Sequence, residues 1–290
     1  MHLKNLFVFA SLFGLSFFGY AEESLFQEIE ARMFECLEGI RSSKTDEMRI
    51  AYSDSLATEV QQAVNSEGCM AYPFSSITQM GILDSPDKLV RIFNWNVPLV
   101  DGTHLYRCFI LHLEDEKAQL YNWHELKQKR NLPTKHDSKY LDSNEWPGAL
   151  YYEIIPLEKG NETIYTLLGW QGLDNITTAK VLEVLQFQRN DIKLGAPIFK
   201  TASGTKKRWS MIYAEDVSAS LKYYPKDKRI VFDHLSPRSN GLEGNYAFYG
   251  PDMSYDAFGY IKGKWEFQRD VYITMGKEQE RRPYKDPRKR

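Results

Sequence analysis

The chain has 290 residues and a formal net charge of −2, and 14% of its residues are aromatic, including 18 tyrosines. The charge is uneven: residues 277–290 carry +4 and Lys4 adds one positive charge, which leaves −7 on residues 22–276. An acidic body argues against a nucleic-acid-binding protein, and the tyrosine content favours a sheet-rich chain with a large core. With two prolines and almost no apolar residue, the basic tail at 277–290 is predicted to be disordered.

The first segment of the chain is typical of a secretory signal peptide. Lys4 supplies a positive charge, residues 6–18 form an apolar run, and Gly19 and Ala21 give the small-x-small pattern of a cleavage site. We therefore predict that residues 1–21 are removed on export; the alternative is an uncleaved N-terminal anchor. The run is too short for a confident membrane span, and no other segment is long enough, so the mature chain is predicted to have no transmembrane segment.

Two helices are predicted next. Residues 24–41 place their apolar side chains on one helical stripe, with Ser24 as the capping residue. Residues 45–65 repeat an apolar side chain about every four positions. The two helices are expected to form an antiparallel hairpin within an N-terminal helical segment, residues 22–88.

From residue 89 the apolar pattern changes to a period of two, which predicts strands. Residues 89–99 and 105–113 are predicted to pair around an Asp-Gly turn. A third strand at 118–123 is followed by a short polar helix near 124–129, and residues 130–147 are predicted to be a loop or a short helix.

Further along, residues 149–157 and 163–172 predict another strand pair, and residues 177–187 predict a short helix capped by Asp174 whose end becomes a strand. Short polar connections then separate seven predicted strands, at 197–201, 207–214, 219–224, 229–235, 246–250, 255–261 and 264–271. This order predicts an α+β fold, in which the N-terminal helical hairpin precedes a large antiparallel β-meander region at 89–276. The strand count also permits a small or partial β-propeller-like arrangement as the alternative.

The run FYGPDMSYDAF, residues 248–258, is the most site-like part of the chain. Its Gly-Pro-Asp is typical of a turn, which makes Asp252 a turn residue. Asp256 falls inside a strand, where aspartate is unfavourable, so it needs an edge position, a partner or a ligand. If the predicted strand at 229–235 pairs with that at 255–261, Asp256 reaches Asp233 or His234 as its partner. Asp256, His234 and Asp252 are therefore the catalytic candidates, and a hydrolase would require them to converge in one concave pocket.

Aromatic side chains are candidates for binding a ligand, namely Trp170, Trp265 and Tyr255. Glu145 and Glu153 could serve as the paired carboxylates of a glycosidase, if they lie about 5–10 Å apart across a bond. The simpler alternative for the tryptophans is packing in the core.

No sequence pattern requires a metal or a cofactor, so none is predicted. His104, Cys108 and His112 share one side of a predicted strand, but positions four apart lie about 13 Å apart. That separation excludes a direct dyad within the strand, and we expect the three residues on a solvent-facing side of a sheet. The alternative is a dyad formed across strands with His124 or His234. In an oxidising compartment Cys36 and Cys69 are the pair that we expect to form a disulfide; the alternative is three small buried apolar side chains.

Several separated segments of the sequence stand out. They are WPGALYYEII and YTLLGWQG between residues 146 and 172, GAPIF at 195–199, IVFDHLSP at 230–237, and FYGPDMSYDAF followed by GKWEF. Together, over residues 75–271, they resemble a family of exported Gram-negative bacterial proteins of unknown function. The resemblance implies export to the periplasm, the envelope or the medium, and it offers no catalytic residues. We expect a non-enzymatic binding or envelope-associated module with an unknown envelope or extracellular ligand. The alternative is a hydrolase acting on a glycan or ester through carboxylates of the C-terminal β region.

Overall fold

The computed structural model describes residues 8–115, 117, 120–130, 137–160, 162–188 and 191–272, with the backbone alone described for residues 8–22 and Asp115. The predicted basic tail at 277–290 and the start of the predicted leader lie outside these residues. Within the described part, neither helix combines the length and the apolar character needed to cross a membrane.

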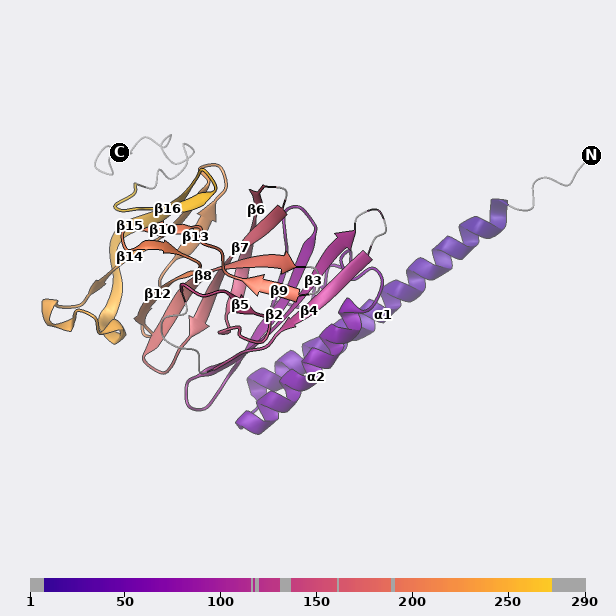
Figure 1. The fold of residues 1–290 in the computed structure, drawn as a ribbon. Coiled ribbons are helices and arrows are strands. Elements are labelled where there is room, and N and C mark those ends of the chain that lie inside the picture. Colours follow the sequence, from indigo (N-terminus) through magenta and orange to yellow (C-terminus); the bar gives the residue numbers. More distant parts are fainter. Residues whose placement is uncertain are drawn as a thin grey trace, which may run out of the picture.

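The chain begins with two antiparallel helices, as the sequence predicts (Figure 1). Helix α1 spans Val8–Ser42 and helix α2 spans Asp46–Val64. Because α1 begins at Val8, Ser24 lies inside the helix, and the cap predicted at Ser24 is wrong. The hydroxyl of Thr45 accepts a hydrogen bond from the backbone N–H of Met48, which caps α2 at its N-terminus. Most of the apolar side chains of both helices form one core with the facing sheet, although Met48 and Tyr52 at the start of α2 are exposed. The buried helical members of this core include Ile29, Met33, Leu37, Leu56 and Val60.

The helices cover a four-stranded sheet, which we call the helix-side sheet. Its strands are β1 (Gly81–Asp84), β2 (Val90–Pro98), β3 (His104–Asp115) and β4 (Leu120–Leu126), in the order β1-β2-β3-β4 with antiparallel pairing. The predicted hairpin at 89–113 is thus confirmed. β1 lies inside the segment that was predicted to be helical, and the polar helix predicted near 124–129 is wrong, because β4 continues to Leu126.

Strand β3 is buried on both sides, which corrects the expected solvent-facing side. Phe109 and Leu111 pack under the helices, whereas Cys108 and Ile110 point into the core on the opposite side of the sheet. Cys108 is completely buried, and His112 stacks on Phe187 of a neighbouring sheet with 3.7 Å between ring centroids.

The next sheet, called the central sheet, contains β5 (Leu141–Asp142), β6 (Leu150–Lys159), β7 (Glu162–Gly172), β8 (Thr177–Gln188) and β9 (Asp191–Leu194) in the order β5-β9-β8-β7-β6, with β12 (Trp209–Ala214) added beside β8. The helix predicted at 177–187 is wrong, because these residues form β8. Leu182 and Val184 are buried on one face and Leu185 on the other. A strand buried on both faces loses the alternating pattern and matches helical spacing by chance. Asp174 instead holds a turn, accepting hydrogen bonds from the backbone N–H groups of residues 176 and 177.

The last sheet, called the outer sheet, has the order β11-β10-β16-β15-β14-β13. Its strands are β10 (Phe199–Thr201), β11 (Gly204–Lys206), β13 (Leu221–Tyr224), β14 (Arg229–Pro237), β15 (Tyr249–Ile261) and β16 (Lys264–Gln268). All pairs are antiparallel except β10 with β16. Two short 3-10 helices, η1 (Asn240–Leu242) and η2 (Tyr246–Phe248), precede β15, so the strand predicted at 246–250 begins later than expected.

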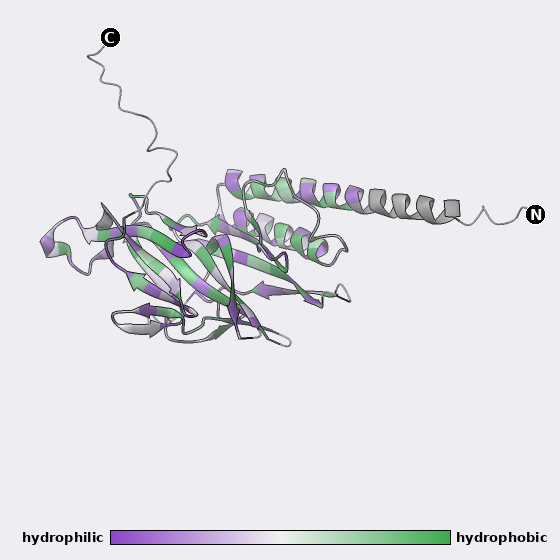
Figure 2. Cartoon of the chain, turned by 90° about the horizontal axis from the view of Figure 1, so that it is seen from above, coloured by the Kyte–Doolittle hydropathy of each residue, from purple (hydrophilic) through white to green (hydrophobic). Residues whose placement is uncertain are grey.

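The three sheets stack face to face, with the helical hairpin on one side and the outer sheet on the other (Figure 1). Three hydrophobic cores separate the four layers: helices against the helix-side sheet, that sheet against the central sheet, and the central sheet against the outer sheet. Hydrophobic and hydrophilic residues alternate along many of the strands (Figure 2). The α+β prediction is confirmed, and stacked layers replace the propeller-like alternative.

Candidate binding groove and the histidine cluster behind it

A β-bulge in β15 brings the three predicted catalytic residues together. Asp233 pairs with Tyr255, but Leu235 already pairs with Pro251, so residues 252–254 bulge out opposite His234. The bulge replaces the hairpin turn predicted at Gly-Pro-Asp. Asp252 keeps its turn chemistry nonetheless, since its carboxylate accepts hydrogen bonds from the backbone N–H (3.1 Å) and hydroxyl (2.7 Å) of Ser254.

His234 lies between two carboxylates, and we call these three residues the histidine cluster. Its Nδ1 is 2.8 Å from Oδ2 of Asp256, and its Nε2 is 4.0 Å from Oδ2 of Asp252. Asp256 is only 4% exposed and also accepts a hydrogen bond from the backbone N–H of Asp270 at 3.1 Å. The predicted need of Asp256 for a partner is therefore met twice, by His234 and by the C-terminal segment.

The histidine cluster has some of the groups that general-base catalysis requires. A buried carboxylate on Nδ1 orients an imidazole and leaves its Nε2 for proton transfer. The hydrogen bonds from Ser254 are the main cause that lowers the pKa of Asp252, which keeps that carboxylate ionised. However, a hydrolase also needs a nucleophile hydrogen-bonded to the base, whereas within the described residues His234 hydrogen-bonds to Asp256 and pairs with Asp252, and both partners are carboxylates.

A groove of about 1190 Å³ lies on the outward face of the outer sheet, the face opposite to the one from which Asp256 points into the core. Side chains alternate across a strand, so Tyr255 faces outward where its neighbour Asp256 faces the core. None of the three histidine-cluster residues lines this groove. Its lining comes from β13 and β14, from the turn between them, from the bulge, and from the segment after β16: Ser220, Lys222, Tyr224, Pro225, Lys226, Asp227, Val231, Met253, Ser254, Tyr255, Asp270, Val271 and Tyr272.

Backbone pairing builds the floor and one wall of this groove. Lys222 pairs with Val231, which places both on the outward face of the sheet beside Tyr224. The backbone N–H of Val271 donates to the carbonyl of Tyr255 at 2.8 Å, which holds the C-terminal segment against β15. Met253 and Tyr272 stand on the rim with 94% and 96% of their surface exposed.

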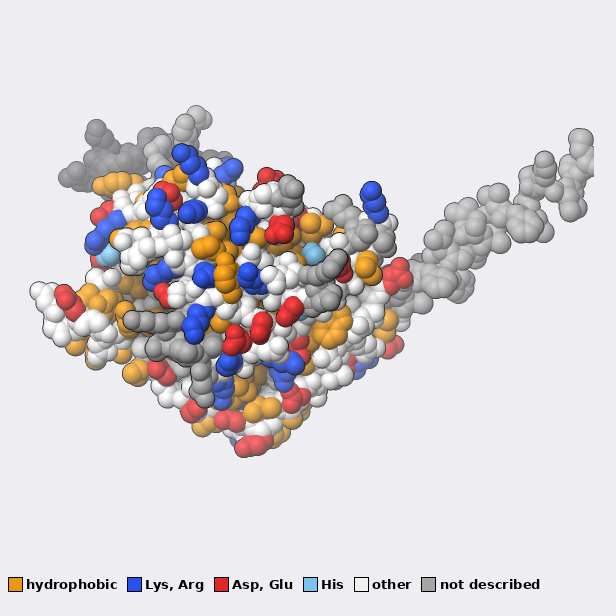
Figure 3. Space-filling view, viewed as in Figure 1, with side chains coloured by type: hydrophobic (Ala, Val, Ile, Leu, Met, Phe, Trp, Pro, Cys, Tyr) orange, Lys and Arg blue, Asp and Glu red, His pale blue; other side chains and the backbone are white. Residues whose placement is uncertain are grey.

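The charges that line the groove cancel. Lys222 and Lys226 contribute two positive charges, and Asp227 and Asp270 contribute two negative ones. Elsewhere on the surface, basic and acidic side chains are interspersed with hydrophobic ones on the face drawn in Figure 3. The groove thus offers tyrosine rings and hydrogen-bonding groups without a net charge.

The free edge of β13 beside the groove is closed by side chains of the central sheet. The hydroxyl of Tyr152 donates to the carbonyl of Leu221 at 2.9 Å, and the carboxylate of Glu153 accepts from the backbone N–H of Tyr223 at 3.3 Å. Burial raises the pKa of Glu153. Because these backbone groups are occupied, another strand cannot add to this edge without displacing both side chains.

Of the predicted ligand-binding residues, the structure places only Tyr255 in the groove. Trp265 is completely buried and donates its indole N–H to Thr166 at 3.0 Å, so its assignment to a ligand is corrected to core packing. Trp170 is half-buried against His104, with ring centroids 5.2 Å apart, and lies outside the groove lining.

The paired glutamates have separate roles. Glu145 forms an ion pair with Lys129 at 2.8 Å, whereas the carboxylate of Glu153 accepts a hydrogen bond from the backbone of β13. Sequence reasoning missed Lys222, Tyr224 and Tyr272. The alternation in LKYY does place Lys222 and Tyr224 on one side of a strand, and this signal could have pointed to them.

Cys36, Cys69 and Cys108 are free cysteines in the structure, so the predicted disulfide between Cys36 and Cys69 is not formed. Cys69 is buried in the core beneath the helices, and the partly buried Cys36 packs against this core. Both positions match the alternative of small apolar side chains. Within the described residues, no group of three or more histidine, cysteine, aspartate or glutamate side chains is arranged to hold a metal ion.

Compared with protein-family models, curated proteins and solved structures, the chain matches none. The resemblance to exported bacterial proteins stays a prediction.

Proposed function

We propose that this chain is an exported, non-enzymatic binding module of the bacterial envelope, and that its ligand is an uncharged glycan held in the groove of the outer sheet. The observation that carries the proposal is the groove itself, which combines three tyrosines with a balanced set of lysines and aspartates. Binding sites of this kind join aromatic surface to a few polar groups that fix orientation.

The chemistry of the lining favours a sugar polymer over other polymers. Tyr224, Tyr255 and Tyr272 each offer an apolar ring face with a polar tip, which suits a ring that is apolar on its C–H faces and polar at its rim. A polyanion would need an excess of lysine or arginine, and the lining has none. A peptide that binds as an added strand would need the edge of β13, which Tyr152 and Glu153 occupy.

The envelope location rests on the sequence. Residues 1–21 have the three parts of a signal peptide, and the ordered matches over residues 75–271 resemble exported proteins of Gram-negative bacteria. An exported protein with an aromatic groove on its outer sheet is well suited to hold or sense a polymer of the cell surface.

A second candidate function is hydrolysis of a glycan or ester at the histidine cluster. The contact of 2.8 Å between His234 and Asp256, with Asp252 on the other ring nitrogen, supports it. In that case the bulge would deliver a base to a ligand bound near residues 252–254, and water would be the attacking group.

A thermal-shift screen separates these candidates. Purified protein is melted with neutral oligosaccharides, with peptidoglycan fragments and with the polyanion dextran sulfate. The proposal expects a rise in melting temperature with one neutral sugar class, none with dextran sulfate, and no cleavage of the sugar. Cleavage that disappears in a His234→Ala variant would replace binding by hydrolysis. A rise with dextran sulfate alone would refute the neutral-glycan assignment.

A further inference from the structure

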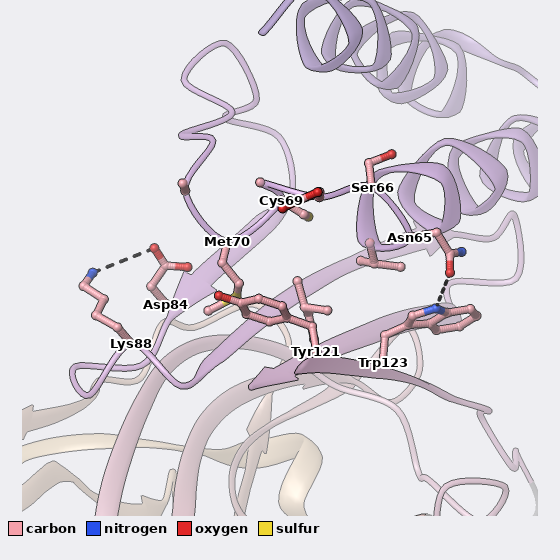
Figure 4. A pocket seen from close by; sticks show the side chains of 13 residues that line it. Asn65, Ser66, Cys69, Met70, Asp84, Lys88, Tyr121 and Trp123 are labelled. Atoms are coloured by element: carbon pink, nitrogen blue, oxygen red, sulfur yellow. Dashed lines mark hydrogen bonds and ion pairs between the residues drawn. The ribbon is translucent and has the colours of Figure 1, made fainter. Parts of the chain in front are cut away.

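A separate cavity of about 820 Å³ lies where helix α2 ends above the helix-side sheet (Figure 4). It lies against the helix-side sheet, whereas the groove lies on the outer sheet, and the two share no lining residue. Its walls are the segment that follows α2, the strands β3 and β4, and the turn between β1 and β2: Val64, Asn65, Ser66, Glu67, Gly68, Cys69, Met70, Ala71, Asp84, Lys88, Leu111, Tyr121 and Trp123.

The wall after α2 is fixed to the sheet by a buried arginine. Arg91 donates from Nη1 to the carbonyls of Cys69 and Tyr72, each at 2.6 Å. The same guanidinium makes two hydrogen bonds to Asp84, at 2.6 and 2.8 Å, and its side chain is only 5% exposed. The cavity is therefore held open by the fold, as sites for small ligands usually are.

The middle of the cavity is largely apolar. Val64 and Leu111 are buried side chains of the surrounding core, and Met70 packs against that core beside Tyr121. Trp123 closes the far end, where its indole N–H donates to Oδ1 of Asn65 at 2.9 Å. An unbranched hydrocarbon chain fits such a lining, because it gains from every apolar contact and needs no hydrogen bond.

The opposite end carries a cation that is weakly paired. In Figure 4, Lys88 and Asp84 lie at one end, and Asn65 and Trp123 at the other. The Nζ of Lys88 is 3.9 Å from Oδ2 of Asp84, and the lysine side chain is 75% exposed. An exposed ion pair of this kind contributes little, and the charge of Asp84 is already matched by Arg91.

The two ends thus differ in sign. Glu67, which lines the cavity directly after α2, carries a negative charge near Asn65, and the C-terminus of the α2 dipole has the same sign. An anionic group is therefore favoured at Lys88 and disfavoured at the end near α2, which fixes the direction of an elongated ligand.

We propose that this cavity binds a small amphipathic anion, a carboxylate on an unbranched hydrocarbon chain, with the carboxylate on Lys88 and the chain over Met70, Leu111 and Tyr121. This inference is independent of the glycan groove, so either can fail without the other.

Calorimetric titration of the full chain with decanoate and with the uncharged decan-1-ol tests it. Decanoate is expected to bind about two- to fivefold more tightly than decan-1-ol, since an ion pair with an exposed lysine is weak but favourable. In a Lys88→Asn variant the two affinities should become equal. Asparagine tolerates the left-handed backbone that Lys88 adopts, with φ of 63°, so this change removes the charge without strain.

An Ala71→Trp variant fills the exposed rim of the cavity and should abolish binding of both compounds. Its melting temperature, and that of Lys88→Asn, report whether each variant is folded. Equal affinity of the two compounds for the unmodified protein, unchanged decanoate binding in Lys88→Asn or in folded Ala71→Trp, or no binding of either compound would each overturn the proposal.

Discussion

Replacement of Asp256 tests whether the histidine cluster stabilises the outer sheet. The carboxylate is 4% exposed and accepts two hydrogen bonds, from Nδ1 of His234 at 2.8 Å and from the backbone N–H of Asp270 at 3.1 Å. Asp256→Ala removes both acceptors at once. It leaves the N–H of Asp270 without its side-chain partner, while the backbone bond from Val271 to Tyr255 still holds the C-terminal segment.

The magnitude follows from these two contacts. A hydrogen bond to a charged group contributes about 1.5–3 kcal/mol, and Asp270 is an exposed residue whose N–H can turn to water, which lowers the share of its bond. His234 keeps 23% of its side chain exposed and can turn to water, which lowers its share. We expect Asp256→Ala to reduce the free energy of unfolding by about 3 kcal/mol, and Asp256→Asn by about half as much, because the amide oxygen can still accept one bond.

Urea denaturation measures this loss as a lower midpoint at unchanged slope. Asp252→Ala is the matched control from the same strand: its carboxylate is 34% exposed and serves a local turn, so the expected loss is under about 1 kcal/mol. If Asp256→Ala and Asp252→Ala lose the same free energy, or if Asp256→Ala loses less than about 0.5 kcal/mol, the assigned role of Asp256 is refuted.

Three further predictions concern other parts of the fold. Burial lowers the pKa of His112 from 6.5 to about 4. The folded protein therefore has its full stability above pH 6.5, where the ring is neutral in both states, and it loses stability as the pH falls from 6.5 towards 4, because the unfolded chain binds the proton more readily. We expect a loss of roughly 2 kcal/mol from this ring after allowing for its partial exposure, and a smaller loss over the same pH window in His112→Gln, measured by denaturation at several pH values; identical pH profiles would contradict it. Burial also raises the pKa of Cys69 to about 12, so the native thiol should react slowly with iodoacetamide, while denatured protein without reductant should take up three labels; a single label would restore the disulfide. Tyr152→Phe should free the carbonyl of Leu221 and destabilise the protein by about 1 kcal/mol, with increased self-association in sedimentation; an unchanged stability and a monomer at all concentrations would show that the edge needs no cap.

The helical hairpin and most strands could be predicted because their patterns are local. Residues 24–41 carry a stripe of period 3.6, and residues 89–113 carry a turn between two apolar runs. Strand β8 could not be recognised, since both of its faces are buried and a continuous apolar run has no period of two. Stacking of three sheets is a long-range arrangement that no local pattern encodes.

For the sites, the pairing of Asp256 with His234 was predictable, because an aspartate inside an apolar strand needs a partner. The groove was not, because its lining joins β13 to residues 270–272, which are almost fifty positions apart in the chain. The same limit explains Trp265, whose burial depends on the central sheet behind it.

Binding of a neutral oligosaccharide to the outer sheet is the central claim, and titration calorimetry on groove variants tests it most directly. With a sugar identified by thermal shift, Tyr224→Ala and Tyr255→Ala are each expected to weaken binding by about tenfold or more, since truncated aromatic anchors often cost over 1 kcal/mol. Tyr246→Ala, which removes a tyrosine 47% exposed outside the groove, should leave the affinity unchanged. Equal affinities for all three folded variants and the unmodified protein would contradict the account.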